Sequence, residues 1–226
     1  MYRRYAIYYT PAPGTPLAEF GADWLGWDSA EGRARSRPAG SAPAIAQITA
    51  APRKYGFHGT IKPPFHLAEG TTVDALQEAL ADLCASAAPV TLDGLHLSRL
   101  GRFLALVPTG DASALAALAG RAVKTLDAFR APASEAELAK RRAANLSPAQ
   151  EAHLLQWGYP YVLDQFRFHM TLTGRLARAE ATQAEAMLGT HLAGLDLAPY
   201  RMTGLTLLGE DAQGMFHQLH RYTLTG

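Results

Sequence analysis

Apolar and polar residues alternate in two short stretches of the chain, residues 55–61 and 166–172. Because successive side chains of a β-strand point to opposite faces, the alternation predicts two strands, each with one apolar and one polar face. We expect the apolar faces to pack on helices. The polar face of the first strand carries His58, Thr60 and Lys62, and that of the second carries Arg167, His169 and Thr171.

The rest of the chain alternates between helical and strand patterns. Residues 5–9 predict a first strand, and residues 11–53, rich in Gly, Pro, Ala and Ser, predict one short helix. A long loop follows at 28–43 that is either mobile or a cover for the site. Two capping-box patterns, at residues 134–137 and 147–150, mark the starts of two helices. In all, helices are expected over 71–87, 112–129, 135–145, 148–156 and 178–192, and strands over 55–65, 90–97, 102–107, 166–173, 202–208 and 215–224.

The two alternating stretches belong to a longer internal repeat. Residues 55–61 align with residues 166–172 at one constant offset, and a helix and a Gly-Leu-x-Leu segment follow each copy. The unit of strand, helix, strand and strand is therefore used twice, around residues 55–108 and 166–224, with a helical insert at about 131–157. Two copies are too few for a solenoid. The chain is expected to form a single bilobal domain over residues 1–226, with a pseudo-twofold axis between the lobes.

The polar faces carry residues suited to phosphoryl chemistry. Two histidines, whose ordinary pKa is about 6.5, can serve as one base and one acid near neutral pH. The hydroxyls of Thr60 and Thr171 can hydrogen-bond phosphoryl oxygens, and nearby cations can stabilise the charge of the transition state. Neither motif contains Asp or Glu, which Mg²⁺ prefers. We expect attack on a phosphodiester without metal or cofactor, in one cleft. For either copy alone, a half-buried histidine bonded to a backbone carbonyl is the alternative.

Composition narrows the class of protein. The 226 residues carry 21 Lys and Arg against 20 Asp and Glu, a formal net charge of +1. Such balance argues against a protein that binds long nucleic acid, which needs a strong basic excess, but allows a small anionic ligand. The single Cys84 excludes an intramolecular disulfide. No stretch approaches the ~18 apolar residues of a membrane span, and the first residues lack the features of a signal peptide. A cytoplasmic protein without a membrane partner is therefore expected.

The motifs resemble those of a known family. The pair His58-Gly59-Thr60 and His169-Met170-Thr171 is similar to the signature of the two-histidine (2H) phosphoesterases, which include RNA 2′,3′-cyclic phosphodiesterases and RNA ligase-like enzymes. The wider text at 54–65, 157–161 and 166–174 resembles a bacterial branch associated with phosphonate metabolism. The resemblance spans essentially the whole chain, although residues 11–54 and the helical insert exceed a minimal core.

The resemblance implies an α+β fold with two antiparallel sheets facing a central cleft and helices on the outside. It also implies that His58, Thr60, His169 and Thr171 form the catalytic set. One histidine would activate water and the other would protonate the leaving oxygen, in an order that the sequence does not determine. The expected reaction is hydrolysis of a small cyclic phosphate in phosphonate or ribose-phosphate metabolism. An RNA-end 2′,3′-cyclic phosphodiesterase or ligase is the alternative, and a non-catalytic nucleotide sensor, which has no need for both an acid and a base, is a third.

Four further side chains are candidates for substrate binding, each with a simpler alternative. Lys62 could contact phosphate or lie at a solvated strand end, and Arg167 could lie at the rim of the cleft. Arg130 could bind substrate or complement a helix dipole. Tyr8 could supply a hydroxyl or a stacking surface, or simply pack in the core. Arg141, on an Ala-rich helix, is expected to be solvated.

Overall fold

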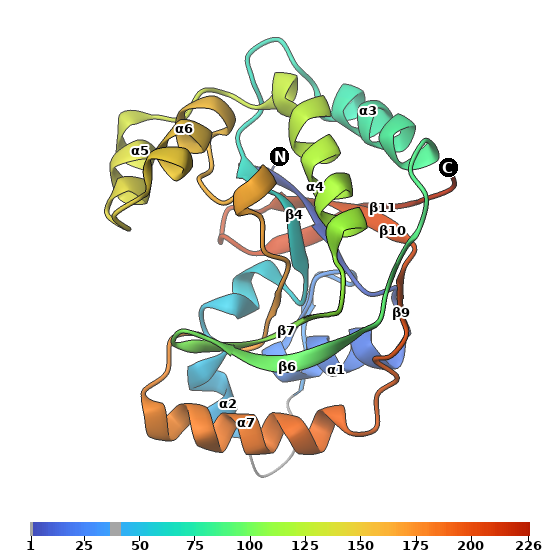
Figure 1. Ribbon diagram of the computed structural model, residues 1–226, viewed down its shortest axis with the longest axis vertical. Coiled ribbons are helices and arrows are strands. Elements are labelled where there is room, and N and C mark those ends of the chain that lie inside the picture. Colours follow the sequence, from blue (N-terminus) through green and yellow to red (C-terminus); the bar gives the residue numbers. More distant parts are fainter. Residues whose placement is uncertain (1, 37–41) are drawn as a thin grey trace.

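The computed structural model describes residues 2–36 and 42–226, and it is an α+β protein. Within this part of the chain, seven α-helices surround a seven-stranded antiparallel sheet and two small two-stranded sheets (Figure 1). The strands are β1 (Tyr5–Tyr9), β2 (Trp27–Asp28), β3 (Arg33–Ala34), β4 (Gly59–Phe65), β5 (Val90–Leu92), β6 (Gly94–Leu100), β7 (Phe103–Thr109), β8 (Met170–Thr171), β9 (Tyr200–Met202), β10 (Gly204–Glu210) and β11 (Phe216–Thr223). The helices are α1 (Pro16–Leu25), α2 (Ala42–Ile48), α3 (Val73–Ala85), α4 (Ser113–Thr125), α5 (Glu135–Arg142), α6 (Pro148–Trp157) and α7 (Arg178–Leu192), with 3₁₀ turns η1 (Pro52–Tyr55), η2 (Asp127–Phe129) and η3 (Leu163–Gln165).

The large sheet has two arms that meet at a narrow junction. Its strand order is β11-β10-β1-β4-β8-β7-β6, so that four strands lie on one side of the junction and three on the other. The junction is the antiparallel pair β4–β8, joined through one residue pair, Gly59 with Met170. The predicted α+β class is confirmed, and the two expected antiparallel walls are the arms of one continuous sheet.

The helices of the two repeats are exchanged between the arms. Helix α3, from the first repeat, packs on β10 and β11 of the second, while α7, from the second repeat, packs on β6 and β7 of the first. Figure 1 shows α3 and α4 on one side of the sheet and α7 on the other. The short strands β5 and β9, which follow α3 and α7, pair with each other. The β-hairpin of each copy of the repeat is thus covered by the helix of the other copy.

Most helices and strands lie where the sequence predicts them. The largest differences between predicted and observed bounds are in the strands of the two His-x-Thr motifs. Strand β1 and helix α7 have the predicted bounds, and α5 and α6 begin at the predicted capping boxes. The second motif strand, expected over 166–173, pairs only at Met170 and Thr171. The first, expected over 55–65, begins only at Gly59 after the turn η1, and it ends at Phe65 as predicted.

The Gly- and Pro-rich segment after β1 is anchored to the core. The indole Nε1 of Trp24 donates to the Leu172 carbonyl at 2.8 Å, and that of Trp27 donates to the Phe216 carbonyl at 3.0 Å. The loop expected at 28–43 contains the small β2–β3 hairpin and the start of α2, and residues 37–41 of it lie outside the described residues. In the part of the chain that the structure describes, no helix has the length and apolar character to cross a membrane.

Candidate active site

The two His-x-Thr motifs cross each other at the junction of the sheet. Gly59 lies opposite Met170 in antiparallel register, so position 58 comes opposite 171, and position 60 opposite 169. Directly opposed residues project to the same face, which is the face away from Met170. Met170 is fully buried, whereas the four motif side chains are only partly buried. The register therefore presents both histidines and both threonines on one face.

The two imidazoles are held in the same way. Nδ1 of His58 donates to the Gly56 carbonyl at 2.9 Å, and Nδ1 of His169 donates to the Arg167 carbonyl at 2.8 Å. A carbonyl oxygen can only accept, so each neutral ring carries its proton on Nδ1 and leaves the Nε2 lone pair available. The Thr60 hydroxyl lies 3.3 Å from Nε2 of His58 and can donate to it. Each ring thus presents an unprotonated Nε2 for proton transfer, and on His58 this atom is hydrogen-bonded to the Thr60 hydroxyl.

The surroundings of His58 keep its ring neutral. Burial lowers its pKa to about 4, against the opposing effect of the hydrogen bond to Gly56, and the charge of a protonated His169 lowers it further. With this pKa the His58 ring is neutral at neutral pH.

Tyr8 forms the floor under His58. The two rings are stacked, with centroids 3.8 Å apart and planes 18° from parallel. Tyr8 is 1% exposed, and burial raises the pKa of its phenol well above the ordinary value. Of the three possibilities named for Tyr8, the structure therefore shows two together: the ring is packed in the core and stacks on the histidine.

A cavity of about 390 Å³ opens over this face, and it is lined by Tyr8, His58, Thr60 and Thr171. His169 lines an adjoining cavity of about 280 Å³ together with Arg167. The two spaces share Thr60, Pro63 and Tyr159 as common walls. The four motif residues thus border two adjoining cavities, where a single cleft was expected.

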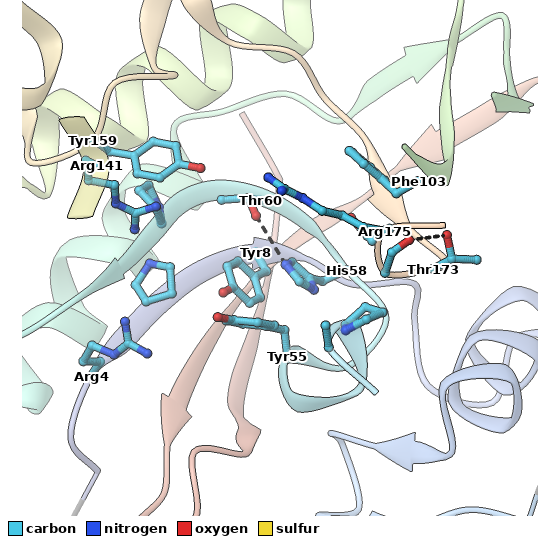
Figure 2. A pocket seen from close by; sticks show the side chains of 16 residues that line it. Arg4, Tyr8, Tyr55, His58, Thr60, Phe103, Arg141, Tyr159, Thr173 and Arg175 are labelled. Atoms are coloured by element: carbon cyan, nitrogen blue, oxygen red, sulfur yellow. Dashed lines mark hydrogen bonds between the residues drawn. The ribbon is translucent and has the colours of Figure 1, made fainter. Parts of the chain in front are cut away.

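The lining of the main cavity is positively charged. Its described residues include Arg4, Arg141 and Arg175 but no carboxylate. Figure 2 shows the guanidinium of Arg175 pointing toward Thr60, with Arg4 and Arg141 at the other end of the cavity. The Arg175 side chain makes no hydrogen bond or ion pair with any described residue. The cavity therefore suits an anionic ligand, although the chain as a whole is almost neutral.

Lys62 does not reach this face, contrary to the expectation. Along β1 and β4, Tyr8 pairs with Thr60 and Ile7 with Lys62, so one step on β1 matches two on β4. This β-bulge reverses the alternation, and Lys62 points to the face opposite Thr60. There it is 2% exposed, and its ammonium donates to the Val123 carbonyl and to Asp127, both at 3.2 Å. Burial lowers its pKa to about 8, although Asp127 opposes the shift.

Arg130 also lies away from the motif histidines. It donates two hydrogen bonds to Asp127, at 2.9 and 3.1 Å, and lines a separate cavity beside the helical insert. Burial raises the pKa of Asp127, but Arg130 and Lys62 together outweigh it and hold the pKa below its usual value. Arg130 therefore belongs to a partly buried ion cluster with Asp127 and Lys62. Arg167 is exposed and borders the His169 cavity, at the rim where it was expected.

The sequence analysis missed the arginines of the main cavity. Arg175 lies two residues beyond the expected end of the second motif strand, at residue 173. Arg4 lies just before the first strand of the chain. Arg141 was expected to be solvated, but its guanidinium lies over the ring of Tyr159, 4.7 Å from the centroid, and borders the cavity. Arg141 lies between Lys140 and Arg142 at the end of α5, and no local pattern distinguishes it from them or marks the other two arginines.

Solved structures with a similar arrangement of elements share little sequence with this chain. A protein described as a phosphoesterase is 17% identical, with a TM-score of 0.45 and coverage of 99% of both chains. LigT of E. coli, in complex with 3′-AMP, is 18% identical with a TM-score of 0.44 over the whole of both chains. Similarities of this size do not identify an activity.

Two curated relatives are closer in sequence. One from Janthinobacterium sp. (strain Marseille) is 38% identical over 218 residues, which cover 93% of this chain and 48% of the relative. Another, from Laribacter hongkongensis (strain HLHK9), is 35% identical over 226 residues, which cover 96% of this chain and 51% of the relative. Both are named ribose 1,5-bisphosphate phosphokinase PhnN, and this chain spans about half of their length. Residues 60–217 match the family described as protein of unknown function (DUF1045), and the chain belongs to that family.

Proposed function

We propose that the protein is a metal-independent phosphodiesterase of the two-histidine type that hydrolyses a small cyclic phosphate. The observation that carries the proposal is the register of Gly59 with Met170, which turns both His-x-Thr motifs toward the same face. The free Nε2 positions of the two rings supply a base and an acid, and the cavity over them is lined by arginines without a carboxylate. These features together suit in-line displacement at a phosphorus atom.

In this mechanism His58 is the base, because its low pKa leaves Nε2 unprotonated at neutral pH. Nε2 of His58 takes a proton from water as the water oxygen bonds to phosphorus. The bond from phosphorus to the ring oxygen breaks, and a protonated His169 donates its Nε2 proton to that oxygen. The products are a phosphomonoester and a hydroxyl of the same molecule. A proton exchange with solvent then restores both rings.

The phosphoryl oxygens are held by the threonines and by Arg175. The hydroxyls of Thr60 and Thr171 flank the crossing point of the two strands, on the same face as the histidines. The unpaired guanidinium of Arg175 meets the charge that gathers on the non-bridging oxygens. Tyr8 holds the His58 ring against rotation through its stacked contact.

The names of the curated relatives suggest the substrate class. They are assigned to ribose 1,5-bisphosphate, and this chain corresponds to about half of their length. We do not transfer the kinase activity in their name, but we infer that this chain acts on a related sugar, a ribose cyclic phosphate. Hydrolysis of a 1,2-cyclic phosphate at the 2-oxygen would leave a 1-phosphate. The second candidate is a 2′,3′-cyclic phosphate at a nucleotide or RNA end, which the open cationic cavity also allows.

The experiment is a turnover assay with ribose 1,2-cyclic phosphate and with 2′,3′-cyclic nucleotides, in the presence and absence of a chelator. We expect turnover that survives chelation and falls by about 10²–10⁴-fold in His58→Ala and in His169→Ala. Loss of turnover with the chelator, restored by a divalent ion, would contradict the metal-free route. Ligand binding without turnover of any diester would favour a nucleotide sensor. His220, exposed on β11 and away from the cavity lining, gives the matched control His220→Ala.

A further inference from the structure

Arg141 stands out among the arginines around the helical insert because it has no acidic partner. Arg4 is paired with Glu210 through two hydrogen bonds, at 2.5 and 2.7 Å. Arg142 is paired with Glu151. The guanidinium of Arg141 makes no hydrogen bond or ion pair with a described residue, and it lies over the ring of Tyr159. Its N–H donors are therefore free for a ligand.

The free donors of Arg141 face the same cavity as His58. Arg141 and Arg4 both line the main cavity, and both also line the neighbouring space at its end beside the insert. Figure 2 shows the two arginines and Tyr159 grouped together, on the opposite side of Thr60 from Thr173. The stacked contact with Tyr159 orients the guanidinium plane without consuming a hydrogen bond.

The geometry of β4 gives the distance between the end of the cavity at Arg141 and the end at His58. Pro64, which borders both spaces beside Arg4 and Arg141, lies four residues along β4 from Thr60. Arg4 likewise lies four residues before Tyr8. Four residues of extended strand span about 13 Å between Cα atoms, and the long arginine side chains shorten the distance between ligand groups. A sugar with an anionic group at each end fits such a spacing in a cavity of about 390 Å³.

We propose that Arg141, supported by Arg4, forms a second anion subsite that selects substrates with a phosphomonoester in addition to the cyclic phosphate. This inference rests on the proposed function and names its substrate class: a cyclic phosphate of a sugar that also carries a terminal phosphate. Glu210 neutralises much of the charge of Arg4, so Arg141 supplies the uncompensated charge of the subsite. The cyclic phosphate lies at the His-x-Thr crossing, and the terminal phosphate lies between Arg141 and Arg4.

The test compares ribose 1,2-cyclic phosphate with its 5-phosphorylated form in the wild type, Arg141→Gln and Arg142→Gln. Arg142 is the matched control because it is the next residue of the same helix and its guanidinium is held by Glu151 outside the cavity. We expect the ratio of kcat/KM for the 5-phosphorylated over the unphosphorylated substrate to fall about 10- to 100-fold in Arg141→Gln, through KM. In Arg142→Gln the ratio stays at the wild-type value. Equal ratios in all three proteins overturn the inference.

A binding measurement separates this inference from the proposed function. Ribose 5-phosphate, which carries the terminal phosphate but has no phosphodiester bond, is titrated into the same three proteins by calorimetry. Binding that weakens at least about 10-fold in Arg141→Gln and not in Arg142→Gln supports the subsite, even if the wild type hydrolyses neither diester and the proposed function fails. Equal affinities in the three proteins, or no binding to the wild type, overturn the subsite whatever the turnover assay gives.

Discussion

The ring of Tyr8 lies flat against the imidazole of His58, with the ring centroids 3.8 Å apart. The stack covers one face of the imidazole and excludes water from it. Burial is the largest cause of the low pKa of His58, about 4, and Tyr8 is part of that burial. A residue on the first strand of the chain thus sets the protonation state of the proposed base on β4.

This contact predicts the pH dependence of the reaction. If His58 is the base, kcat/KM falls as the pH drops through the pKa of the free enzyme, so the wild type loses activity only near pH 4. Tyr8→Ala admits water to the ring, and we expect the acid limb to move up toward the ordinary value of about 6.5. Tyr8→Phe keeps the stack and serves as the control. The pKa of His58, followed by NMR in all three proteins, gives the same comparison without turnover. An acid limb that stays near pH 4 in Tyr8→Ala would show that the stack does not set the pKa.

Arg175 tests the charge of the main cavity. Its guanidinium points toward Thr60 and has no hydrogen-bond or ion-pair partner among the described residues. We expect Arg175→Gln to lower kcat/KM for a cyclic phosphate by about 10- to 100-fold, because one charge-assisted hydrogen bond to the phosphoryl oxygens is lost. Arg178→Gln, at the exposed start of α7, removes the same charge outside the cavity and is the control. Equal activities of the two variants would place Arg175 outside the site.

For Lys62, in contrast to Arg175, we expect that removing the charge leaves the activity unchanged. Its ammonium is buried against Asp127 on the face away from the cavity. Lys62→Met fills the same space and leaves Asp127 paired with Arg130. We expect kcat/KM close to the wild-type value, and a free energy of unfolding that is unchanged or higher. A tenfold loss of activity with an intact fold would restore Lys62 as a substrate ligand.

The same lysine gives the wild type a characteristic dependence of stability on pH. Its pKa falls from 10.5 to about 8 in the folded chain. Between these values the unfolded chain binds the proton that the folded chain has released, so this group makes the free energy of unfolding rise with pH. Chemical denaturation at several pH values should show this rise in the wild type and a smaller one in Lys62→Met. Identical slopes in the two proteins would mean that Lys62 keeps its ordinary pKa.

The middle residue of the first motif, Gly59, has no room for a side chain because the ring of Phe168 lies against it. A Cβ built on Gly59 would lie 2.3 Å from the ring of Phe168, much closer than real contacts allow. Gly59→Ala therefore forces Phe168 aside at the crossing of the two motifs. We expect the variant to lose about 1–3 kcal/mol of stability and most of its activity, measured by thermal unfolding and turnover. Full stability and activity would mean that the junction tolerates a displaced ring.

The sequence predicts the parts of this site that depend on local alternation. The buried Met170 and the half-buried His169 follow from the two-residue period of a strand, and the repeated motif brings the second pair of residues into the hypothesis. The two-residue alternation does not hold at Lys62. A β-bulge between Thr60 and Lys62 turns the lysine to the opposite face of the strand. A bulge is set by pairing with β1, which no local pattern records.

The remaining differences come from long-range contacts. Arg141 reaches the cavity only because the helical insert folds back over Tyr159. The exchange of α3 and α7 between the arms depends on the pairing of strands far apart in the chain. The repeat predicts that two similar units exist, but not which helix covers which hairpin.

If the two histidines act on one phosphorus atom, a crystal structure of the protein with inorganic phosphate or sulfate bound will show where that atom lies. We expect one anion at the crossing of the two motifs, with Nε2 of His58 and Nε2 of His169 both within hydrogen-bond distance of its oxygens. An anion held by only one of the two rings, or separate anions in the two adjoining cavities, would contradict it.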